Sequence, residues 1–486
     1  MLAFSTVFPI DAMSSALPFA VSLALWLGAV AGSPLAARQP PEESPPPPGA
    51  AGAEAAGEEA PAAGEEEPAP GLTLAWGFEA KAHFRSSDEN RFPVPFSFDD
   101  PRLPPVPGPV FLETVSPGDH LELSVVTLFA DAAWGSGIAA HAKIDLVDLY
   151  DRNPTSGDRQ VDVDEAWLRF GRETAPGALP AGAGAYLKVG KLPKLERQDD
   201  RHLESYGLVS TAFNRFEDLG VELGLDLGRH LYLKATATQG NPVFLRDPNA
   251  LAGDNGTEER LRGAEPPFGS GVPILYDAEV EDVDADGELE LGAALGLRFA
   301  DASGSRAVDL LLFGYRRDLA ETVDLEGTFY GGDLDLLRGP FDEFPYPGLD
   351  GVRKEEVGAN LWLYLGGLSL FAQVVDQELA GLPRRGWEAE VAWAVDLPLV
   401  WAAGGSQLFA FVQPAVRWSR LDNDFANPAR TPFPSGNWDW EKLDAGLRLG
   451  IVAGVDLTVE YAANRFQTAA GERENDELLT TLRWAR

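Results

Sequence analysis

Charged side chains recur at alternate positions in several segments that are otherwise apolar or rich in glycine. The basic members of this set are Arg169, Lys188, Lys234, Arg298, Arg417, Arg448 and Arg483. The acidic members are Glu165, Glu222, Asp226, Glu288, Glu290, Glu388, Glu390, Asp444, Asp456 and Glu460. In a β-strand, alternate side chains share one face, so each segment would present its charges to the same side. Facing rows of opposite charge orient polar solutes, and rings of charge set ion selectivity.

Acidic residues outnumber basic residues in this set, which predicts a weak preference for cations if the charges line a channel. The same excess runs through the whole chain, where 76 Asp and Glu stand against 39 Lys and Arg, for a net charge of −37. Such a balance argues against a nucleic-acid-binding protein. The alternative interpretation of the set is that its members pair with charges on adjacent strands and only support a wall.

Other site chemistries find little support in the sequence. The chain has no cysteine, which excludes disulfides, Cys-ligated metals and thiol catalysis. No G-x-S-x-G or Walker loop occurs, and the five histidines form no H-x-x-x-H pair. Asp282, Asp284 and Asp286 have the spacing that begins a calcium loop, but Ala293 stands where the bidentate acid belongs. We therefore predict no catalytic residue, no metal site, no cofactor and no enzymatic activity.

The elements that would position these charges are strands, because apolar and polar residues alternate with period two from Leu72 onward. In the segment 443–451, for example, apolar residues occupy every second position and Asp444 and Arg448 lie between them. Sixteen segments share this pattern: 72–84, 121–131, 137–149, 160–171, 185–191, 218–227, 229–239, 287–300, 306–317, 357–366, 367–376, 386–396, 406–419, 442–451, 453–463 and 475–485. Their number is even and their length is that of a membrane-spanning strand, about 9–11 residues.

The connections between these strands alternate in length. Shorter ones are expected at 134–136, 172–184, 228, 301–305, 366–367, 397–405 and 453. Mostly longer ones are expected at 85–120, 150–159, 192–217, 240–286, 318–356, 377–385, 420–441 and 464–474. This asymmetry predicts an all-β fold, a single 16-stranded antiparallel transmembrane β-barrel (14–18 strands being compatible) with short periplasmic turns and long extracellular loops.

A soluble all-β protein, such as a pair of sandwiches or a propeller, is the alternative fold. The membrane barrel is favoured because the apolar face of each strand is almost unbroken and the other face suits a wet lumen. It is also favoured by aromatic residues near strand ends, where interfacial girdles belong. These are Trp76, Trp134, Tyr186, Trp387, Trp401, Trp418, Tyr461 and Trp484.

The first seventy-one residues are predicted to lie outside the barrel. An apolar stretch followed by Ala29-Val30-Ala31 and Gly32 indicates a signal peptide over 1–31, although no Lys or Arg precedes Arg38. An uncleaved anchor helix is the alternative. Residues 32–71 are rich in Pro, Ala and Glu, which predicts a disordered periplasmic linker, and the barrel then spans 72–486.

Two stretches resemble a known family. The segment 164–196, containing DEAWLRFG and AYLKVGKLPKLE, resembles outer-membrane porins of the phosphate-selective type from Gram-negative bacteria. The C-terminal stretch DAGLRLGIVAGVDLTVEYAAN…ENDELLTTLRWAR is similar to the last strands of such porins, and alginate-export barrels are related. The chain departs from the family by ending in Trp484-Ala485-Arg486 rather than an aromatic residue, and by lacking the Lys-rich rings that select phosphate.

The resemblance implies a bacterial outer-membrane porin that lets small polar or ionic solutes diffuse passively through a charged, water-filled lumen. Its partners would be outer-membrane lipid, lipopolysaccharide, the solutes and two further copies in a homotrimer. By strand order the third long loop, 192–217, would fold inward and narrow the channel. Its charged residues are Lys194, Arg197, Asp199, Asp200, Arg201, Glu204 and Arg215.

Two alternatives to this function remain open on the sequence, together with one alternative for the loop that covers the channel. One is export of an anionic polysaccharide, which would need a more basic lumen. Another is a structural or adhesive barrel that does not conduct. The loop 240–286 is also a candidate for covering the channel, and either loop could instead be a surface loop with no role in permeation.

Overall fold

A computed structural model describes residues 71–87, 91–93, 111–113, 118–135, 137–148, 161–175, 177–180, 182–198, 201–213, 217–240, 289–301, 304–319, 351–398, 402–403, 406–423, 439–468 and 471–486. The signal peptide and linker predicted over 1–71 fall almost entirely outside these residues. So do the loop 240–286 apart from its first residue, the acidic stretch around Asp284, and Trp401. Within the described part of the chain, no helix is long and apolar enough to cross a membrane.

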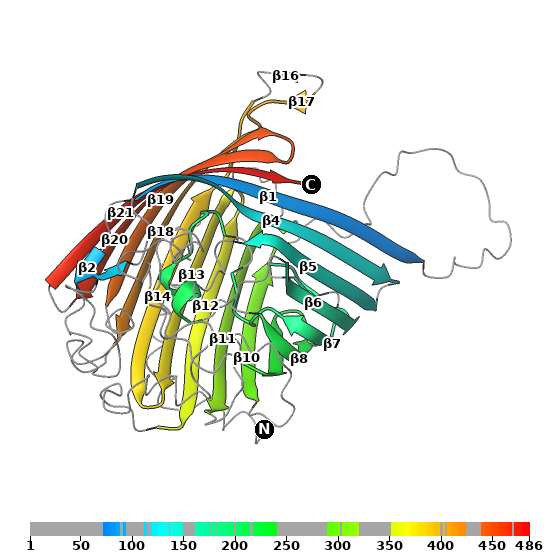
Figure 1. Cartoon of the computed structure of the whole chain (residues 1–486). Coiled ribbons are helices and arrows are strands. Elements are labelled where there is room, and N and C mark those ends of the chain that lie inside the picture. The colour runs from blue at the N-terminus through cyan, green and yellow to red at the C-terminus, as the bar shows by residue number, and fades with distance from the viewer. Residues whose placement is uncertain are drawn as a thin grey trace.

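The strands form one closed antiparallel barrel, which confirms the predicted fold class (Figure 1). Sixteen long strands make the wall: β1 (Leu72–Ser87), β4 (Gly118–Trp134), β5 (Ile138–Asp148), β6 (Asp162–Gly171), β7 (Gly184–Leu192), β8 (Asp218–Leu227), β9 (Leu231–Thr238), β10 (Glu290–Ala300), β11 (Arg306–Asp318), β12 (Arg353–Leu365), β13 (Leu368–Leu379), β14 (Leu382–Trp393), β18 (Phe411–Asn423), β19 (Trp440–Val452), β20 (Val455–Thr468) and β21 (Gly471–Ala485). The short β15 (Val395–Asp396) continues β14 along β18. Small hairpins lie outside this sheet, β2 (Arg91–Pro93) with β3 (Phe111–Glu113) and β16 (Ala402–Ala403) with β17 (Ser406–Gln407).

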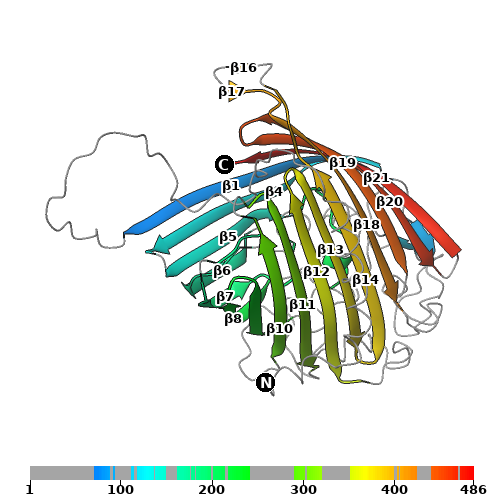
Figure 2. The same cartoon turned by 180° about the vertical axis from the view of Figure 1, so that it is seen from behind.

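The barrel closes where its first strand meets its last. β1 pairs with β4 on one side and with β21 on the other, and Figures 1 and 2 show the two ends of the wall side by side. The backbones of Phe78 and Arg486 exchange two hydrogen bonds, of 2.9 and 3.0 Å. Arg483 adds an ion pair with Glu79 at 2.5 Å. The pairing of β1 with β21 therefore leaves neither of these two strands as an unpaired edge.

The two faces of the wall differ as period-two alternation requires. On β19, Leu443 and Leu447 are each 48% exposed, whereas Asp444 between them is 0% exposed. The outer face of the barrel is thus an apolar surface that none of the residues described by the structure covers. The inner face carries the polar and charged side chains, together with glycines.

Two connections are shorter than the sequence predicted. The chain turns between β13 and β14 at Ala380 and Gly381, and Thr468 of β20 pairs with Gly471 of β21, so the longer connections expected at 377–385 and 464–474 are wrong. Ala380 and Gly381 both have positive φ, 51° and 87°, as a two-residue hairpin turn of this type needs. The strands continue past the apolar belt into polar residues, where hydropathy no longer marks them.

The connections define the two ends of the barrel. Those at 135–137, 172–183, 228–230, 301–305, 366–367, 394–410 and 453–454 lie at what we call the turn end, and the others lie at the loop end. One connection of each end is important for the interior: 172–183, named here the turn-end segment, and 193–217, named here the inner segment.

Candidate functional site

The predicted charge rows lie on the inner face of the wall. Every described member is buried or half-buried: Glu165, Arg169, Lys188, Glu222, Asp226, Lys234, Glu290, Arg298, Glu388, Glu390, Arg417, Asp444, Arg448, Asp456, Glu460 and Arg483. Glu288 lies outside the described residues. Tyr186, by contrast, is wrong as a girdle residue, because it is 7% exposed and its hydroxyl donates to Glu222. It shares the parity of Lys188, which places both on the inner face.

Many of these charges pair along the wall. Arg448 contacts Asp456 at 2.9 Å, and Arg298 contacts Asp226 at 3.2 Å. Lys188 and Lys234 both approach Glu222, at 3.9 and 3.7 Å. Cross-strand pairing, the alternative role considered for single residues, therefore occurs throughout the rows.

The inner segment enters the barrel and carries its only helix among the described residues, α3 (Leu208–Ala212). In both Figure 1 and Figure 2 this helix lies within the ring of strands, and it contacts β13, β14, β18 and β19. Asp199, Asp200 and Arg215 fall outside the described residues. The other predicted charges of the segment, Lys194, Arg197, Arg201 and Glu204, are buried or half-buried inside the barrel.

Carboxylates of the wall hold the backbone of the inner segment. Glu460 accepts hydrogen bonds from the backbone N–H groups of Glu204 and Ser205, at 2.9 and 3.3 Å, and from the Ser205 hydroxyl. Glu390 accepts from the backbone N–H of His202 at 2.9 Å and also contacts its ring Nδ1. Charge-assisted hydrogen bonds of this kind are stronger than neutral ones, so the wall fixes the path of the segment.

The same wall caps both ends of α3. A five-residue helix is too short to be stable alone, and Gly207 at its N-cap has no side chain to bond the first amides. Glu388 accepts from the N–H of Val209 at 3.2 Å, and Ser419 accepts from that of Leu208 at 3.3 Å. At the other end, Arg384 donates to the carbonyl of Ala212 at 2.6 Å.

Arg417 lies where the inner segment meets the acidic wall residues. It is 1% exposed and donates to Asp444 at 2.8 and 3.0 Å, to Ser205 at 2.7 Å and to Glu390 at 3.4 Å. Lys442 pairs with the other oxygen of Asp444 at 3.0 Å and donates to the carbonyl of Tyr206 at 2.7 Å. These two cations offset the carboxylates that hold the segment, as buried charges require.

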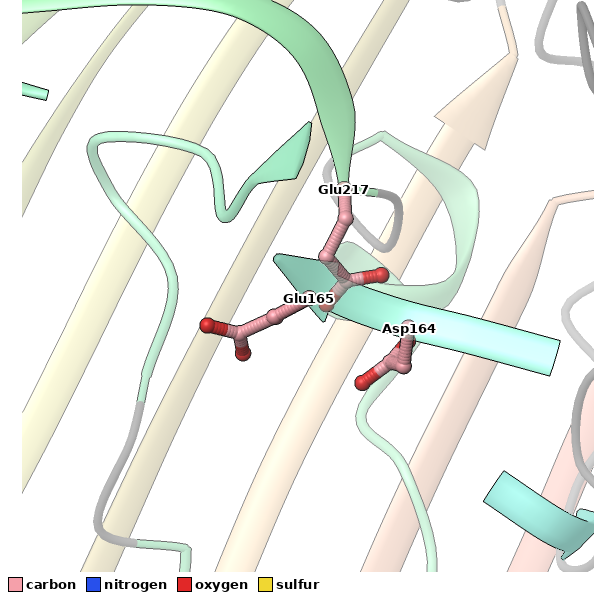
Figure 3. A group of neighbouring side chains, drawn as sticks. All are labelled: Asp164, Glu165 and Glu217. Carbon is pink, nitrogen blue, oxygen red and sulfur yellow. The ribbon is translucent and has the colours of Figure 1, made fainter. Parts of the chain in front are cut away.

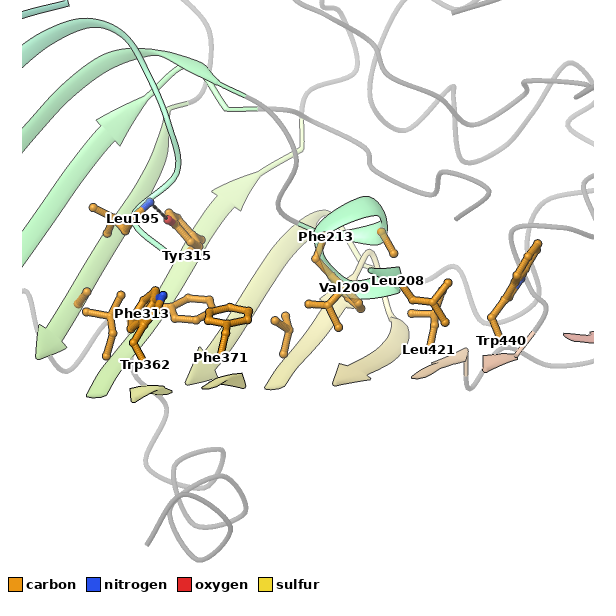
Figure 4. Close-up of a cluster of buried hydrophobic side chains, with 14 of the residues drawn as sticks. Leu195, Leu208, Val209, Phe213, Phe313, Tyr315, Trp362, Phe371, Leu421 and Trp440 are labelled. Atoms are coloured by element: carbon orange, nitrogen blue, oxygen red, sulfur yellow. Dashed lines mark hydrogen bonds between the residues drawn. The ribbon is translucent and has the colours of Figure 1, made fainter. Parts of the chain in front are cut away.

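Apolar contacts complete this attachment (Figure 4). Leu208, Val209 and Phe213 of the inner segment form one buried cluster with aromatic wall residues such as Phe371 and Trp440. Gly386 of β14 makes the contact possible, because an added Cβ would lie 2.6 Å from the Phe213 ring. The interior thus contains a small hydrophobic core in addition to its charges.

The start of the inner segment is fixed on β11. The Tyr315 hydroxyl accepts a hydrogen bond from the N–H of Leu195 at 3.1 Å and donates to the carboxyl of Glu196, which is 0% exposed. Burial raises the pKa of Glu196 to about 8, because the charge of Lys194 offsets the burial only in part. Lys194 itself is held by Glu290 and by Asp218.

Three carboxylates, Asp164 and Glu165 of β6 and Glu217 of the inner segment, gather within 4.8 Å in the way that metal ligands do (Figure 3). Basic side chains already neutralise these carboxylates. Arg197 forms ion pairs with Glu165 and Glu217, and Lys143 forms an ion pair with Asp164. Burial and the charge of Asp164 raise the pKa of Glu217 well above its usual value. This arrangement fits an ion-paired anchor for Arg197 better than a metal centre.

Several residues that make contacts inside the barrel were not predicted from the sequence. Lys442 and Tyr315 lie at inner-face parity within the predicted segments 442–451 and 306–317, so applying that parity to every position of these segments would have found them. Ser205, Glu196 and Glu173 lie on connections, where no periodicity applies. Only their three-dimensional contacts identify them.

Comparisons with known proteins concern the whole barrel. No protein-family model and no curated protein sequence matches the chain. Among solved structures, the outer membrane channel DcaP of Acinetobacter baumannii is 9% identical, with 86% of this chain and 98% of that chain covered and a TM-score of 0.47. OmpF of Salmonella typhi, solved in complex with daunomycin, is 9% identical, with coverages of 85% and 97% and a TM-score of 0.43. The outer membrane protein OpdK of Pseudomonas aeruginosa is 10% identical, with coverages of 85% and 99% and a TM-score of 0.35.

Proposed function

We propose that this protein is a porin of the bacterial outer membrane, through which small polar or ionic solutes diffuse passively. The observation that carries the proposal is the closed wall of sixteen strands with an apolar outer face and a charged inner face. An apolar belt needs lipid around it, and a charged interior needs water within it. Lipid and lipopolysaccharide would contact the belt, and trimer formation stays a prediction.

The inner segment would narrow the channel. Its side chains and those of the wall neutralise one another in pairs, so the segment is a fixed obstacle rather than a loose loop. Solutes would pass between this obstacle and the remaining inner face. The size limit would follow from the position of the segment, and the ion preference from the charges that stay in contact with water.

The inward charge rows supply the proposed selectivity. The predicted set holds ten acidic and seven basic residues. An acidic excess raises the local concentration of cations, so a weak cation preference is the expected behaviour. Arg169 and Lys234, whose inner side chains stay 25% and 20% exposed, would act against this preference and keep it weak.

Swelling of proteoliposomes tests the proposal directly. Vesicles containing the purified, folded protein should swell in isosmotic arabinose faster than empty vesicles, and the rate should fall for larger sugars. A heat-unfolded sample reconstituted in the same way is the control. Rates equal to those of empty vesicles for every sugar would overturn the proposal.

A non-conducting structural barrel is the second candidate. The observation that favours it is the buried apolar cluster between the inner segment and the wall, because such a core would also stabilise a permanent plug. The swelling assay separates the two, since a plugged barrel admits no sugar of any size.

A further inference from the structure

A serine, a histidine and a glutamate form a chain of side-chain hydrogen bonds inside the barrel. Nε2 of His202, on the inner segment, lies 3.2 Å from the hydroxyl of Ser369 on β13. Nδ1 of the same ring lies 2.9 Å from a carboxylate oxygen of Glu390 on β14. No short motif in the sequence marks this arrangement, because Ser369 and His202 lie 167 positions apart. The entry of the inner segment into the barrel brings the three side chains together.

Glu390 fixes the ring of His202 from one side. The oxygen that contacts Nδ1 also accepts from the backbone N–H of His202 at 2.9 Å and from the side-chain amide of Gln198 at 3.3 Å. The other oxygen accepts from Arg417 at 3.4 Å. A carboxylate can only accept, so the neutral His202 ring carries its proton on Nδ1.

This tautomer sets the direction of the second hydrogen bond. With its proton on Nδ1, the ring has an acceptor at Nε2, and the Ser369 hydroxyl donates to it. A serine that donates to a histidine, which in turn donates to a carboxylate, is the arrangement by which a serine hydroxyl is made nucleophilic. The same chemistry recurs on unrelated folds, since it depends on geometry rather than on sequence order.

The surroundings of Ser369 favour an apolar substrate. Ser369 is the second residue of β13, next to the hairpin turn at 366–367, and thus lies near the turn end of the barrel. It is 7% exposed and the His202 side chain is 12% exposed, so both keep some contact with solvent. Tyr364 of β12 lies directly opposite Ser369, and Phe371 follows two positions later on the same face. An acyl group bound beside Ser369 would therefore meet aromatic rings.

We propose that Ser369, His202 and Glu390 give the barrel a second activity, the hydrolysis of small neutral esters whose acyl group is apolar or aromatic. Oγ of Ser369 attacks the carbonyl carbon of the ester while its proton passes to Nε2 of His202. The bond from that carbon to the alcohol oxygen breaks, and the alcohol leaves with the proton. Ser369 and His202 are the catalytic residues, and Glu390 is a positioning residue that orients the ring and stabilises its positive charge.

Water completes the reaction. A water molecule gives a proton to Nε2 of His202 and attacks the acyl carbon with its oxygen. The bond between this carbon and Oγ of Ser369 breaks, Oγ takes the proton back, and the free acid leaves. The activity goes beyond the proposed channel and does not require that the barrel conduct ions.

Hydrolysis of p-nitrophenyl acetate by the folded, full-length barrel in detergent tests the proposal. The wild type should release p-nitrophenolate faster than a heat-unfolded sample. Ser369→Ala and His202→Gln should each lower kcat/KM about a hundredfold, the usual contribution of a positioned base and its nucleophile. Ser305→Ala, which removes a hydroxyl that donates to Asp301 in a turn at 3.0 Å, should keep the wild-type rate.

Glu390→Gln tests the positioning role separately. It should lower kcat about tenfold or more and leave KM nearly unchanged, because the ring of His202 is no longer held and charged in the transition state while the substrate still binds. Folding of every variant is verified by its heat-modifiable gel mobility. An equal loss through KM alone would show that Glu390 acts on substrate binding and would contradict the positioning role.

A fluorophosphonate probe distinguishes a nucleophile from a structural hydrogen bond. It should attach covalently to Ser369 of the folded wild type, as located by mass spectrometry, and should spare Ser205, whose hydroxyl donates to Glu460 rather than to a histidine. Labelling of Ser369 should disappear in His202→Gln.

Three results would overturn the proposed hydrolysis: a folded wild type no faster than its heat-unfolded control, equal rates in wild type and Ser369→Ala, or no probe on Ser369. A barrel that conducts without hydrolysing would contradict this inference alone. A barrel that hydrolyses without conducting would contradict only the proposed channel.

Discussion

At the scale of single residues, the interior depends on carboxyl groups whose partners differ. Glu196 is buried on Tyr315 with only partial compensation from Lys194, and its pKa is raised to about 8. Glu204 pairs with Lys81 at 3.1 Å, and although burial opposes it, the charge of Lys81 holds the pKa of Glu204 well below its usual value. The pKa values of two glutamates eight residues apart on the inner segment are thus shifted in opposite directions.

Glu196 predicts a loss of stability at alkaline pH. The folded protein favours its protonated form, so the stabilisation is complete below about pH 4.5, declines as pH rises and is gone above about pH 8. The midpoint of heat unfolding in detergent should therefore fall between pH 5 and pH 8 more steeply in the wild type than in Glu196→Gln. Glu204→Gln, the matched control, should keep the wild-type slope in that range, and equal slopes for all three proteins would contradict the role of Glu196.

Gly207 leaves the space that the Glu388 carboxylate occupies against α3. An added Cβ would overlap the Glu388 carboxylate that accepts from Val209. Gly207→Ala should lower the free energy of unfolding by about 1–3 kcal/mol, the usual cost of overpacking. It should also change single-channel conductance, because α3 must shift relative to the wall.

Gly137→Ala is the control for that substitution, since nothing lies within 4 Å of its added Cβ. Both free energies are measured by urea unfolding followed through tryptophan fluorescence. An alanine at position 207 that changes neither stability nor conductance would show that Glu388 does not fix the segment.

At the scale of elements, strand parity decides which side chains meet water. On β4, Asp131 faces inward with a side chain 40% exposed, and Leu128 faces outward at 44% exposed. Because the two positions are similarly exposed, a difference in their labelling would report whether water or lipid surrounds them. Because the chain has no cysteine, single cysteines can be placed at either position without background.

Thiol labelling in lipid vesicles should separate the two positions. A water-soluble, membrane-impermeant thiosulfonate should modify Asp131→Cys quickly and leave Leu128→Cys unmodified, because lipid covers the outer face. Mass spectrometry of the labelled protein gives the extent. Equal modification of both, in protein shown to be folded, would contradict the membrane orientation of the wall.

The strands were largely predictable because their cause is local. Alternation of apolar and polar residues gave all sixteen long strands, and the same parity placed Arg417 and Asp444 on one face. Strand ends beyond the apolar belt, such as Gln377 to Arg385, carry no such alternation. For this reason the sequence predicts loops where the structure has the β13–β14 and β20–β21 hairpins. The path of the inner segment was not predictable in detail, because contacts such as those of Ser205 with Glu460 join residues far apart in sequence.

At the scale of the whole molecule, two connections divide the interior. The inner segment enters from the loop end and is fixed to the wall by Arg417, Glu388 and Glu460. The turn-end segment enters from the opposite end and brings Glu173 to a separate group of cations. The two connections can be altered independently because they share no described ion pair.

Single-channel conductance in a planar bilayer, under a salt gradient, tests the central claim most directly. The purified, folded barrel should give discrete, ohmic current steps with a reversal potential of the cation-selective sign, because acidic residues exceed basic ones on the inner face. An anion-selective potential would keep the channel but contradict the charge assignment. Absence of steps from protein whose folding is verified by its heat-modifiable gel mobility would contradict the channel itself.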